Sequence, residues 1–270
     1  MSKKEDAVVS AVDMTSERMD DPIGTVAMPI RDSINAQTVM SIMQTDWPGQ
    51  VDKIWARGNL LALQRNHLVG RMRGEWILFI DDDMVWQPDA VRRLLKTQEA
   101  LIEQGLEPDI VGALCFSRSI PHQPTLYFKW PEQGSYNFME TWDDDVVEVD
   151  ATGMAFALIR KAAFERISGS EMPPYEVRAN NNRTADFFRW YGGLGEDLRF
   201  CDDVRAVGGR IFVDTRIEIG HVSEKTVSHK DFIREIAERS DLDQMNRERI
   251  NKDMGLPTLT RRKAKQMLYG

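Results

Sequence analysis

Cysteine and long hydrophobic runs are both scarce in this chain. Only two cysteines occur among 270 residues, in unrelated sequence contexts, so neither a disulfide framework nor a Cys-x-x-Cys metal site is predicted. The longest apolar runs, such as residues 76–80, are far shorter than the roughly 20 residues that span a bilayer. Residues 1–20 are polar and charged, unlike a signal peptide. These absences predict a chain without a membrane span, located in the cytoplasm, where thiols stay reduced.

Positive charge is also in deficit. The chain has 35 Lys and Arg residues against 43 Asp and Glu residues, which gives a formal net charge of −8. This balance disfavours broad, sequence-independent binding to the phosphate backbone of nucleic acids. A small anionic substrate needs only local positive charge or a metal ion. Because a chain of this length buries about three quarters of its unfolded surface, any metal would serve chemistry rather than hold the fold together.

Strand and helix patterns alternate through the first half of the chain, and no internal repeat is visible. Apolar strand patterns occur at residues 25–29, 52–56, 76–80 and 109–115, and helical spacing of apolar residues occurs at 36–45, 59–72 and 88–105. This alternation predicts an α/β, Rossmann-like and mostly parallel sheet with helices on both faces. Such sheets bind ligands at the carboxyl ends of their strands.

The second half of the chain is less regular. An aromatic stretch at residues 122–145 is expected to form a loop or hairpin beside the site, and residues 172–183 are expected to form a loop. Further strands are predicted at 146–149, 155–159 and 210–214, and helices at 196–207 and from 229 onward. We therefore expect a flexible arm at 1–21, a main domain at 22–225, and a C-terminal helical extension with an exposed basic tail at 226–270. The extension could pack on the domain or mediate a homo-oligomer.

Three consecutive carboxylates, Asp81, Asp82 and Asp83, directly follow the apolar strand at residues 76–80. The strand delivers them to the carboxyl edge of the sheet, where they repel one another. A divalent ion such as Mg²⁺ or Mn²⁺ would relieve this repulsion, since these ions prefer oxygen ligands; the alternative is a turn or helix cap. A second acidic triplet at 143–145 precedes its strand, so we expect it at the opposite edge as a solvated loop.

Arg65 lies within the apolar stripe of the helix at residues 59–72, on the face expected to pack against the sheet. A buried guanidinium requires a partner. The sequence leaves two interpretations open: a structural pair with a carboxylate, or a contact to a nucleotide or its phosphates. Arg31 and Asp32 follow the first strand at the same edge and could hold a base or ribose.

Glu196 and Asp197 open a predicted helix, and Asp197 heads its apolar face. The helix dipole stabilises a carboxylate at this position in its ionised form, as a general base requires. The alternative is an ordinary capping acid. His221 ends a strand-like run at residues 217–222. A lone histidine is more often structural, but beside a carboxylate cluster it is a candidate metal ligand.

Four motifs together resemble the nucleotide-sugar glycosyltransferases of the A-type fold, in particular the family 2-like enzymes. They are TVAMPIRDS, GEWILFIDDDM with an Asp-x-Asp, GEDLRFCDDVRAVGG, and VDTRIEIGHV, in the family's order, and they span residues 25–222. The stretches QRNHLV, VGALCFSR and DATGMAFALIRKAAFE further resemble a subgroup found in phage and prokaryotic genomes. The resemblance implies the A-type fold, sugar transfer, and a location in the cytoplasm, or in the host cytoplasm for a phage enzyme.

The resemblance also implies roles for individual residues. In such enzymes Mn²⁺ or Mg²⁺ carries the donor diphosphate, which maps to Asp83 and His221 as ligands, with Asp81 at the metal or the ribose. Asp197 would be the base of an inverting reaction, with Glu196 beside it. The resemblance places Pro29, Arg31, Asp32, Arg65, Asp81 and Asp82 around a donor, with a UDP-sugar as first candidate, and Trp190, Tyr191 and Gly193 on the acceptor side.

Alternatives remain open from the sequence. A retaining glycosyltransferase shares the fold, and a nucleotidyltransferase also uses paired acids, although the glycine-rich phosphate loop of the sugar-nucleotide type is absent from TVAMPIRDS. A non-catalytic binding protein on this fold is the third alternative. The acceptor is not specified: a protein hydroxyl, a glycan and a hydroxylated DNA base all suit an aromatic site, because aromatic faces stack on sugars and bases alike.

Overall fold

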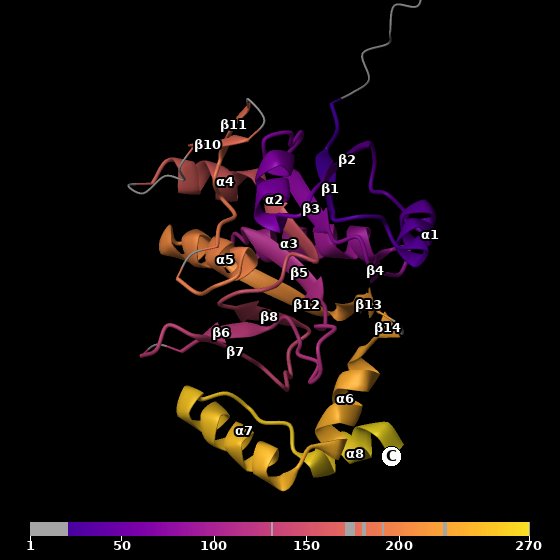
Figure 1. Cartoon of the computed structure of the whole chain (residues 1–270), viewed down its shortest axis with the longest axis vertical. Coiled ribbons are helices and arrows are strands. Elements are labelled where there is room, and N and C mark those ends of the chain that lie inside the picture. Colours follow the sequence, from indigo (N-terminus) through magenta and orange to yellow (C-terminus); the bar gives the residue numbers. More distant parts are fainter. Residues whose placement is uncertain are drawn as a thin grey trace, which may run out of the picture.

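A seven-stranded sheet forms the centre of the computed structural model (Figure 1). The structure describes residues 21–130, 132–170, 176–179, 182–190, 192–223 and 226–269, so residues 1–20 of the predicted arm lie outside it. The strand order is β2-β1-β3-β9-β5-β12-β8. These strands are β1 (Gly24–Ile30), β2 (Val51–Arg57), β3 (Trp76–Ile80), β5 (Ile110–Leu114), β8 (Val146–Val149), β9 (Phe156–Arg160) and β12 (Ile211–Glu218).

The sheet is mostly parallel, with two reversed strands. β1 runs parallel to both β2 and β3, and β12 runs parallel to β5, whereas β9 is antiparallel to its neighbours β3 and β5 and β8 is antiparallel to β12. The predicted fold class is therefore confirmed. The two reversals were not predicted, because a continuous apolar run marks a buried strand but carries no information on its direction.

Helices cover both faces of the sheet, as predicted. On one face, α2 (Leu61–Val69), α4 (Lys161–Ser168) and α5 (Glu196–Ala206) pack on a cluster that includes Ile77 and Phe79; on the other, α1 (Ala36–Gln44) and α3 (Ala90–Glu103) pack on one that includes Leu78 and Ile80. Successive side chains of β3 thus enter opposite cores. This double burial explains why the strand is uniformly apolar up to the point where the three aspartates begin.

Three small sheets accompany the seven-stranded sheet. β4 (Met84–Val85), β13 (Gly220–Val222) and β14 (Thr226–Val227) form one, and β6 (Tyr127–Lys129) pairs with β7 (Tyr136–Phe138) in the predicted aromatic region. β10 (Glu176–Ala179) pairs with β11 (Asn182–Ala185), so the described parts of the predicted loop at 172–183 include a hairpin. Cross-strand pairing gives this polar segment regular structure without an apolar pattern that a sequence could reveal.

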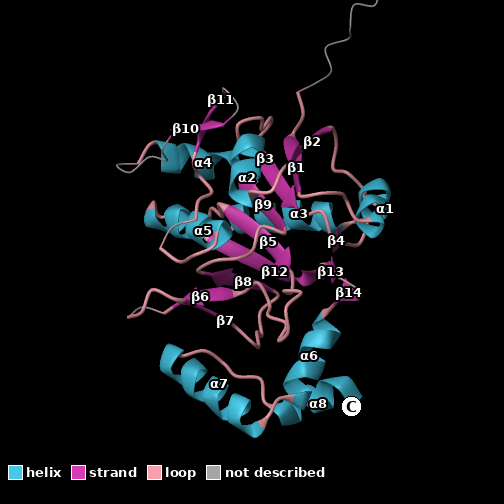
Figure 2. Ribbon diagram, in the orientation of Figure 1, coloured by secondary structure: helices cyan, strands magenta, loops and turns pink. Residues whose placement is uncertain are grey.

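The C-terminal extension consists of α6 (His229–Glu238), α7 (Asp241–Met254) and α8 (Arg261–Tyr269), at one end of the long axis (Figure 2). Ser228 and Asp231 form a capping box at the start of α6. The predicted basic tail forms the helix α8; most of its described residues are exposed, but Ala264 is fully buried and Leu268 packs on the core. These two residues form an apolar i, i+4 pair that the surrounding charges obscure. None of the helices described is long and apolar enough to cross a bilayer.

A buried ion cluster, here called the Glu140 cluster, fixes this extension to the hairpin region. The fully buried Glu140 carboxylate accepts hydrogen bonds from Arg239 Nη2 at 2.7 Å and Arg247 Nε at 2.9 Å. Arg247 also donates to Asn137 Oδ1 and to the Phe138 carbonyl, and its guanidinium lies 3.7 Å from the Phe138 ring centroid. Arg239 at the end of α6 and Arg247 in α7 thereby bind Glu140, which lies just after β7.

Candidate active site

The carboxylates of Asp81, Asp82 and Asp83 point to three different partners at the end of β3. Asp81 Oδ1 accepts a hydrogen bond from Arg65, Asp82 Oδ2 accepts one from the Arg31 backbone N–H at 3.0 Å, and Asp83 contacts His221. Burial raises the pKa of Asp82, and the Asp83 and Asp81 charges add to that rise against the Arg31 hydrogen bond. Each of the three carboxylates thus has a partner of its own within the protein.

Arg65 is the centre of a buried ion cluster, here called the Arg65 cluster. Its side chain is 2% exposed, with Nη1 2.5 Å from Glu196 Oε1 and Nη2 3.0 Å from Asp81 Oδ1. The rings of Phe79 and Phe188 lie 5.9 Å from the guanidinium carbon. Of the two interpretations left open by the sequence, the structure shows the carboxylate pair. Burial raises the pKa of Glu196, Arg65 opposes this rise, and the Asp197 charge adds to it.

Asp197 lies in the first turn of α5, beside this cluster. The Leu198 N–H donates to Asp197 Oδ1 at 2.8 Å, as expected for a carboxylate at a helix N-terminus. Burial raises the pKa of Asp197, while the Arg65 charge opposes the rise. A Cβ added at Gly195 would lie 2.9 Å from Asp197 Oδ1. Burial and the Asp197 charge raise the pKa of Tyr127 to about 12.

Asp83 and His221 form the second centre. β13 pairs with β4 so that His221 lies opposite Met84, and its Nε2 is 3.3 Å from Asp83 Oδ1. His221 Nδ1 lies 3.0 Å from the Phe116 carbonyl oxygen. Because a carbonyl can only accept, Nδ1 carries a hydrogen, and Nε2 is the ring nitrogen that faces Asp83. Burial acts to raise the pKa of Asp83, but the hydrogen bond and charge of His221 and the charge of Arg118 leave it lowered.

Arg118 is a site residue that the sequence did not single out. Its Nη1 lies 2.8 Å from Asp83 Oδ2, and its side chain is 49% exposed. It belongs to the segment that follows β5, a strand whose carboxyl end faces the same edge as that of β3. A cation shortly after a strand of the predicted sheet was the available signal, but exposed arginines after strands are too common to be distinctive.

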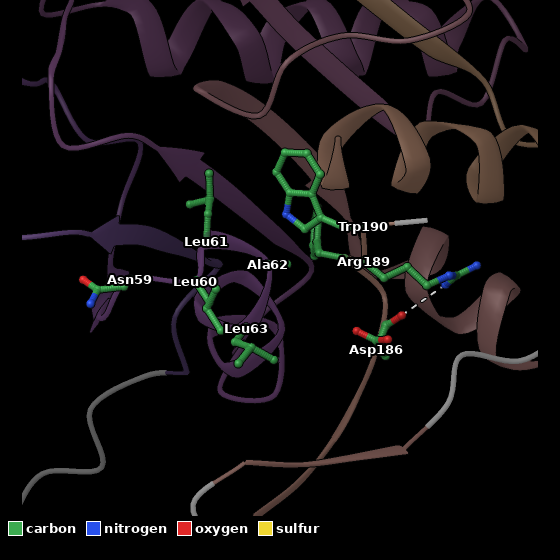
Figure 3. Close-up of a pocket in the computed structure, with 9 residues that line it drawn as sticks. Asn59, Leu60, Leu61, Ala62, Leu63, Asp186, Arg189 and Trp190 are labelled. Atoms are coloured by element: carbon green, nitrogen blue, oxygen red, sulfur yellow. Dashed lines mark hydrogen bonds between the residues drawn. The ribbon is translucent and has the colours of Figure 1, made fainter. Parts of the chain in front are cut away.

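A pocket of about 520 Å³ opens at the start of α2 (Figure 3). Residues 59–63 line one side, and Asp186, Phe188, Arg189 and Trp190 line the other. The 186–188 segment is held by Asn66, which donates to Asp186 Oδ1 and the Phe188 carbonyl and accepts from the Phe188 N–H. The Phe188 ring, in turn, contacts the Arg65 guanidinium, so one wall separates the pocket from the cluster.

Residues 40–167 match the profile of glycosyl transferase family 2. This segment is a family 2 glycosyltransferase domain. It contains Arg65, the three aspartates and Arg118, and the protein is accordingly an enzyme that catalyses glycosyl transfer. The crystal structure of A197 from STIV is similar at 16% identity over 76% of this chain and 88% of that chain, with a TM-score of 0.45. The structure of S. aureus TarS 1–349 is similar at 15% identity over 90% of this chain and 68% of that chain, with a TM-score of 0.40. No curated protein matches the sequence.

The other predicted site residues of this glycosyltransferase lie outside the Arg65 cluster and the Asp83–His221 pair. Pro29 is buried in β1, whereas Arg31 and Asp32 are exposed and pair with each other at 3.4 Å. Trp190 is 70% exposed at the pocket, and Gly193 has a φ of 80° in the left-handed region. Tyr191 lies outside the described residues.

Within the described residues, no group of three or more His, Cys, Asp or Glu side chains is arranged to hold a metal. Asp81, predicted to contact the metal or the ribose, accepts a hydrogen bond from Arg65 at Oδ1. One expectation about carboxylates needs correction in this glycosyltransferase. The triplet at 143–145 is exposed, as expected, but not at the opposite edge: β8 runs antiparallel to β12, so the start of β8 lies near the later part of β12.

Proposed function

We propose that this glycosyltransferase moves a sugar from a nucleotide-diphosphate donor, with UDP-sugars as first candidates, to an acceptor hydroxyl with inversion at the anomeric carbon. The observation that carries the proposal is the approach of His221 Nε2 to within 3.3 Å of Asp83 Oδ1, at the same edge of the sheet as Asp197. One centre suits the leaving diphosphate and the other suits the acceptor proton.

The atoms at Asp83 and His221 fit a divalent cation. The Phe116 carbonyl fixes the imidazole so that Nε2 can ligate, as backbone carbonyls do at known metal sites. A single carboxylate and a single imidazole leave coordination positions for phosphate oxygens and water, which is typical of nucleotide sites. The nitrogen ligand favours Mn²⁺ over Mg²⁺. When bound, such an ion would stabilise the negative charge of the departing diphosphate.

Asp197 is the proposed general base. Its carboxylate would take the proton of the acceptor hydroxyl while that oxygen forms a bond to the anomeric carbon; the bond from this carbon to the diphosphate oxygen breaks, and its electron pair leaves with the nucleotide. The raised pKa of Asp197 brings it closer to the operating pH, which improves a base. Glu196 is committed to Arg65, so we assign it a positioning role.

The donor and acceptor are proposed to approach from different sides. Because Arg65 holds Asp81 Oδ1, Asp81 would offer its other oxygen to the donor ribose, and Arg31, Asp32 and Asp82 lie beyond β1 and β3 at the base side. The acceptor would enter through the pocket at Trp190, whose exposed indole offers a stacking face. We propose residues 22–225 as the transferase domain and 226–270 as its extension.

Calorimetry of UDP binding tests the metal role. UDP should bind at least tenfold more weakly in chelator than in Mn²⁺, since the ion is a principal partner of the diphosphate. Asp83→Ala should remove this difference, whereas Asp144→Ala, in the exposed second triplet, should preserve it. Equal UDP affinity in the wild type with and without chelator would refute the proposed site.

The product decides the remaining alternatives. Incubation with UDP-sugars and candidate acceptors should release UDP and give a glycoside with inverted anomeric configuration, read by NMR. A retained configuration would move the enzyme to the retaining class and remove Asp197 from the role of base. Release of a sugar phosphate, with UMP transferred to the acceptor, would instead indicate nucleotidyl transfer.

A further inference from the structure

We infer that Arg118 is a built-in counterion of the metal site: it neutralises Asp83 in the absence of donor and shifts to the donor diphosphate when donor and metal bind together. The inference rests on the proposed function, because it assumes that Asp83 and His221 receive a metal–nucleotide. It assigns Arg118 a role in donor binding and in suppressing the binding of metal without donor.

The contact itself has the geometry of an exchangeable pair. Arg118 Nη1 is 2.8 Å from Asp83 Oδ2, while Asp83 Oδ1 faces His221 Nε2 at 3.3 Å. The carboxylate is 17% exposed but the arginine side chain is 49% exposed, so the guanidinium covers the site from the solvent side. An ion pair with one partner half in water is weak, and its arginine can leave at little cost.

The charges of these side chains make donor and metal interdependent. The opposite charges of Asp83 and Arg118 cancel, so a divalent ion arriving alone would meet a guanidinium at the carboxylate it must bind. A nucleoside diphosphate supplies the missing negative charge, and a guanidinium binds phosphate oxygens in bidentate fashion. Arg118 therefore weakens the binding of metal alone and strengthens the binding of the metal–nucleotide, which is a coupling free energy between two ligands.

The segment around Arg118 is anchored on both sides and exposed between the anchors. Before it, the Phe116 ring packs on Phe232 of α6 at 5.3 Å between centroids. After it, the buried His122 places Nε2 3.1 Å from Glu235 Oε1 of α6, and its Nδ1 lies 2.8 Å from the Ser117 carbonyl oxygen. Residues 118–121 are exposed. The C-terminal extension thus fixes where the segment starts and ends, and leaves the arginine side chain able to move.

The test compares two affinities in Arg118→Met, which keeps the length of the side chain and removes its charge. Free Mn²⁺ measured by electron paramagnetic resonance gives the affinity for metal alone, and calorimetry in saturating Mn²⁺ gives the affinity for UDP. Compared with the wild type, we expect Arg118→Met to bind Mn²⁺ alone about fivefold more tightly. We expect it to bind UDP at least about fivefold more weakly, since fivefold is the lower end of ordinary ligand coupling. Arg118→Lys, which retains a point charge, should restore weak Mn²⁺ binding and only part of the UDP affinity.

Arg160→Met is the matched control, because Arg160 makes a carboxylate pair of the same 2.8 Å length with Glu107 at the other edge of the sheet. It should change neither affinity. Two affinities that fall together in Arg118→Met, or that both stay unchanged, would overturn the role of Arg118 while the wild type still shows Mn²⁺-dependent UDP binding. A wild type without that dependence would overturn the proposed function and this inference together.

Discussion

Two buried charge clusters in this glycosyltransferase are unbalanced in opposite directions. In the Arg65 cluster one guanidinium is shared by Glu196 and Asp81, with Asp197 close by. In the Glu140 cluster one carboxylate is shared by Arg239 and Arg247. The first cluster has surplus negative charge and the second has surplus positive charge.

The two surpluses are handled differently. The other donors of Arg247 bind Asn137 Oδ1 and the Phe138 carbonyl, and its guanidinium lies against the Phe138 ring, so this arginine has fixed polar and aromatic partners besides Glu140. In the Arg65 cluster, burial raises the pKa values of Glu196 and Asp197, neighbouring carboxylates add to the rise, and the single Arg65 charge opposes it. The Glu140 cluster therefore serves to anchor the C-terminal extension. The Arg65 cluster, with more carboxylates than cations, provides a group that can take a proton.

The largest expected effect is that of Asp197→Asn on transfer. Loss of the proposed base should lower the single-turnover rate by roughly 10²–10⁴-fold, the usual contribution of acid–base catalysis. UDP affinity should stay near that of the wild type, because Asp197 belongs to the other centre. An Asn variant that transfers at a nearly unchanged rate would mean that Asp197 only stabilises the start of α5. The Arg65 cluster would then have a structural role, like the Glu140 cluster.

Glu140→Leu should have the largest effect on stability. It leaves two buried guanidinium groups without their carboxylate, and breaking a buried pair in this way costs about 3–5 kcal/mol. Urea denaturation should show a lower midpoint at an unchanged slope. Glu107→Leu, at an exposed pair, is the control and should shift the midpoint little. A small effect would mean that Arg239 and Arg247 are stabilised by solvent and do not depend on the Glu140 carboxylate.

Gly195→Ala should perturb Asp197 without removing it. The new Cβ would lie 2.9 Å from Asp197 Oδ1, so the carboxylate must shift. Since catalysis depends steeply on the position of the base, we expect transfer to fall on the order of tenfold at unchanged UDP affinity. Gly169→Ala, where the nearest atom is 3.4 Å away, is the matched control. An unaltered rate in Gly195→Ala would show that this carboxylate position is not critical.

The smallest expected effect is a pH-dependent difference in melting temperature between the wild type and Asp197→Asn. The folded-state pKa of Asp197 is raised, so the wild type loses stability as the pH rises from the ordinary Asp range through the folded pKa, and the Asn variant does not. At pH 7–8 the melting temperature of the variant should therefore equal or exceed that of the wild type. This excess should shrink as the pH falls toward about pH 4. Thermal melts across this range measure it, and a difference that grows on acidification would contradict the raised pKa.

The sequence predicted the layers of the fold and the edge where the acidic residues gather. Strand 76–80 and its three aspartates were identified because buried apolar runs and the charges that end them are local features. The partner of Arg65 was not identified, since Glu196 lies 131 residues away. Hydropathy shows that a charge is buried but not which distant charge meets it.

Strand direction and weak amphipathicity account for the main errors. The triplet at 143–145 was assigned to the wrong edge because β8 is antiparallel, and α8 was taken for a tail because charged residues surround Ala264 and Leu268. Arg118 ends the stretch VGALCFSR that resembles the glycosyltransferase subgroup, but its contact with Asp83 depends on how the segment after β5 meets β4 and β13.

The dependence of the segment after β5 on α6 has a consequence for biosynthesis. The ribosome makes the sheet first, and at about 5–20 residues per second the helices α6–α8 follow several seconds later. Until then Phe116 lacks Phe232, His122 lacks Glu235 and Glu140 lacks both of its arginines. Until α6–α8 are translated, the nascent enzyme would expose the aromatic residues that α6 covers and would lack the contacts that fix the segment after β5.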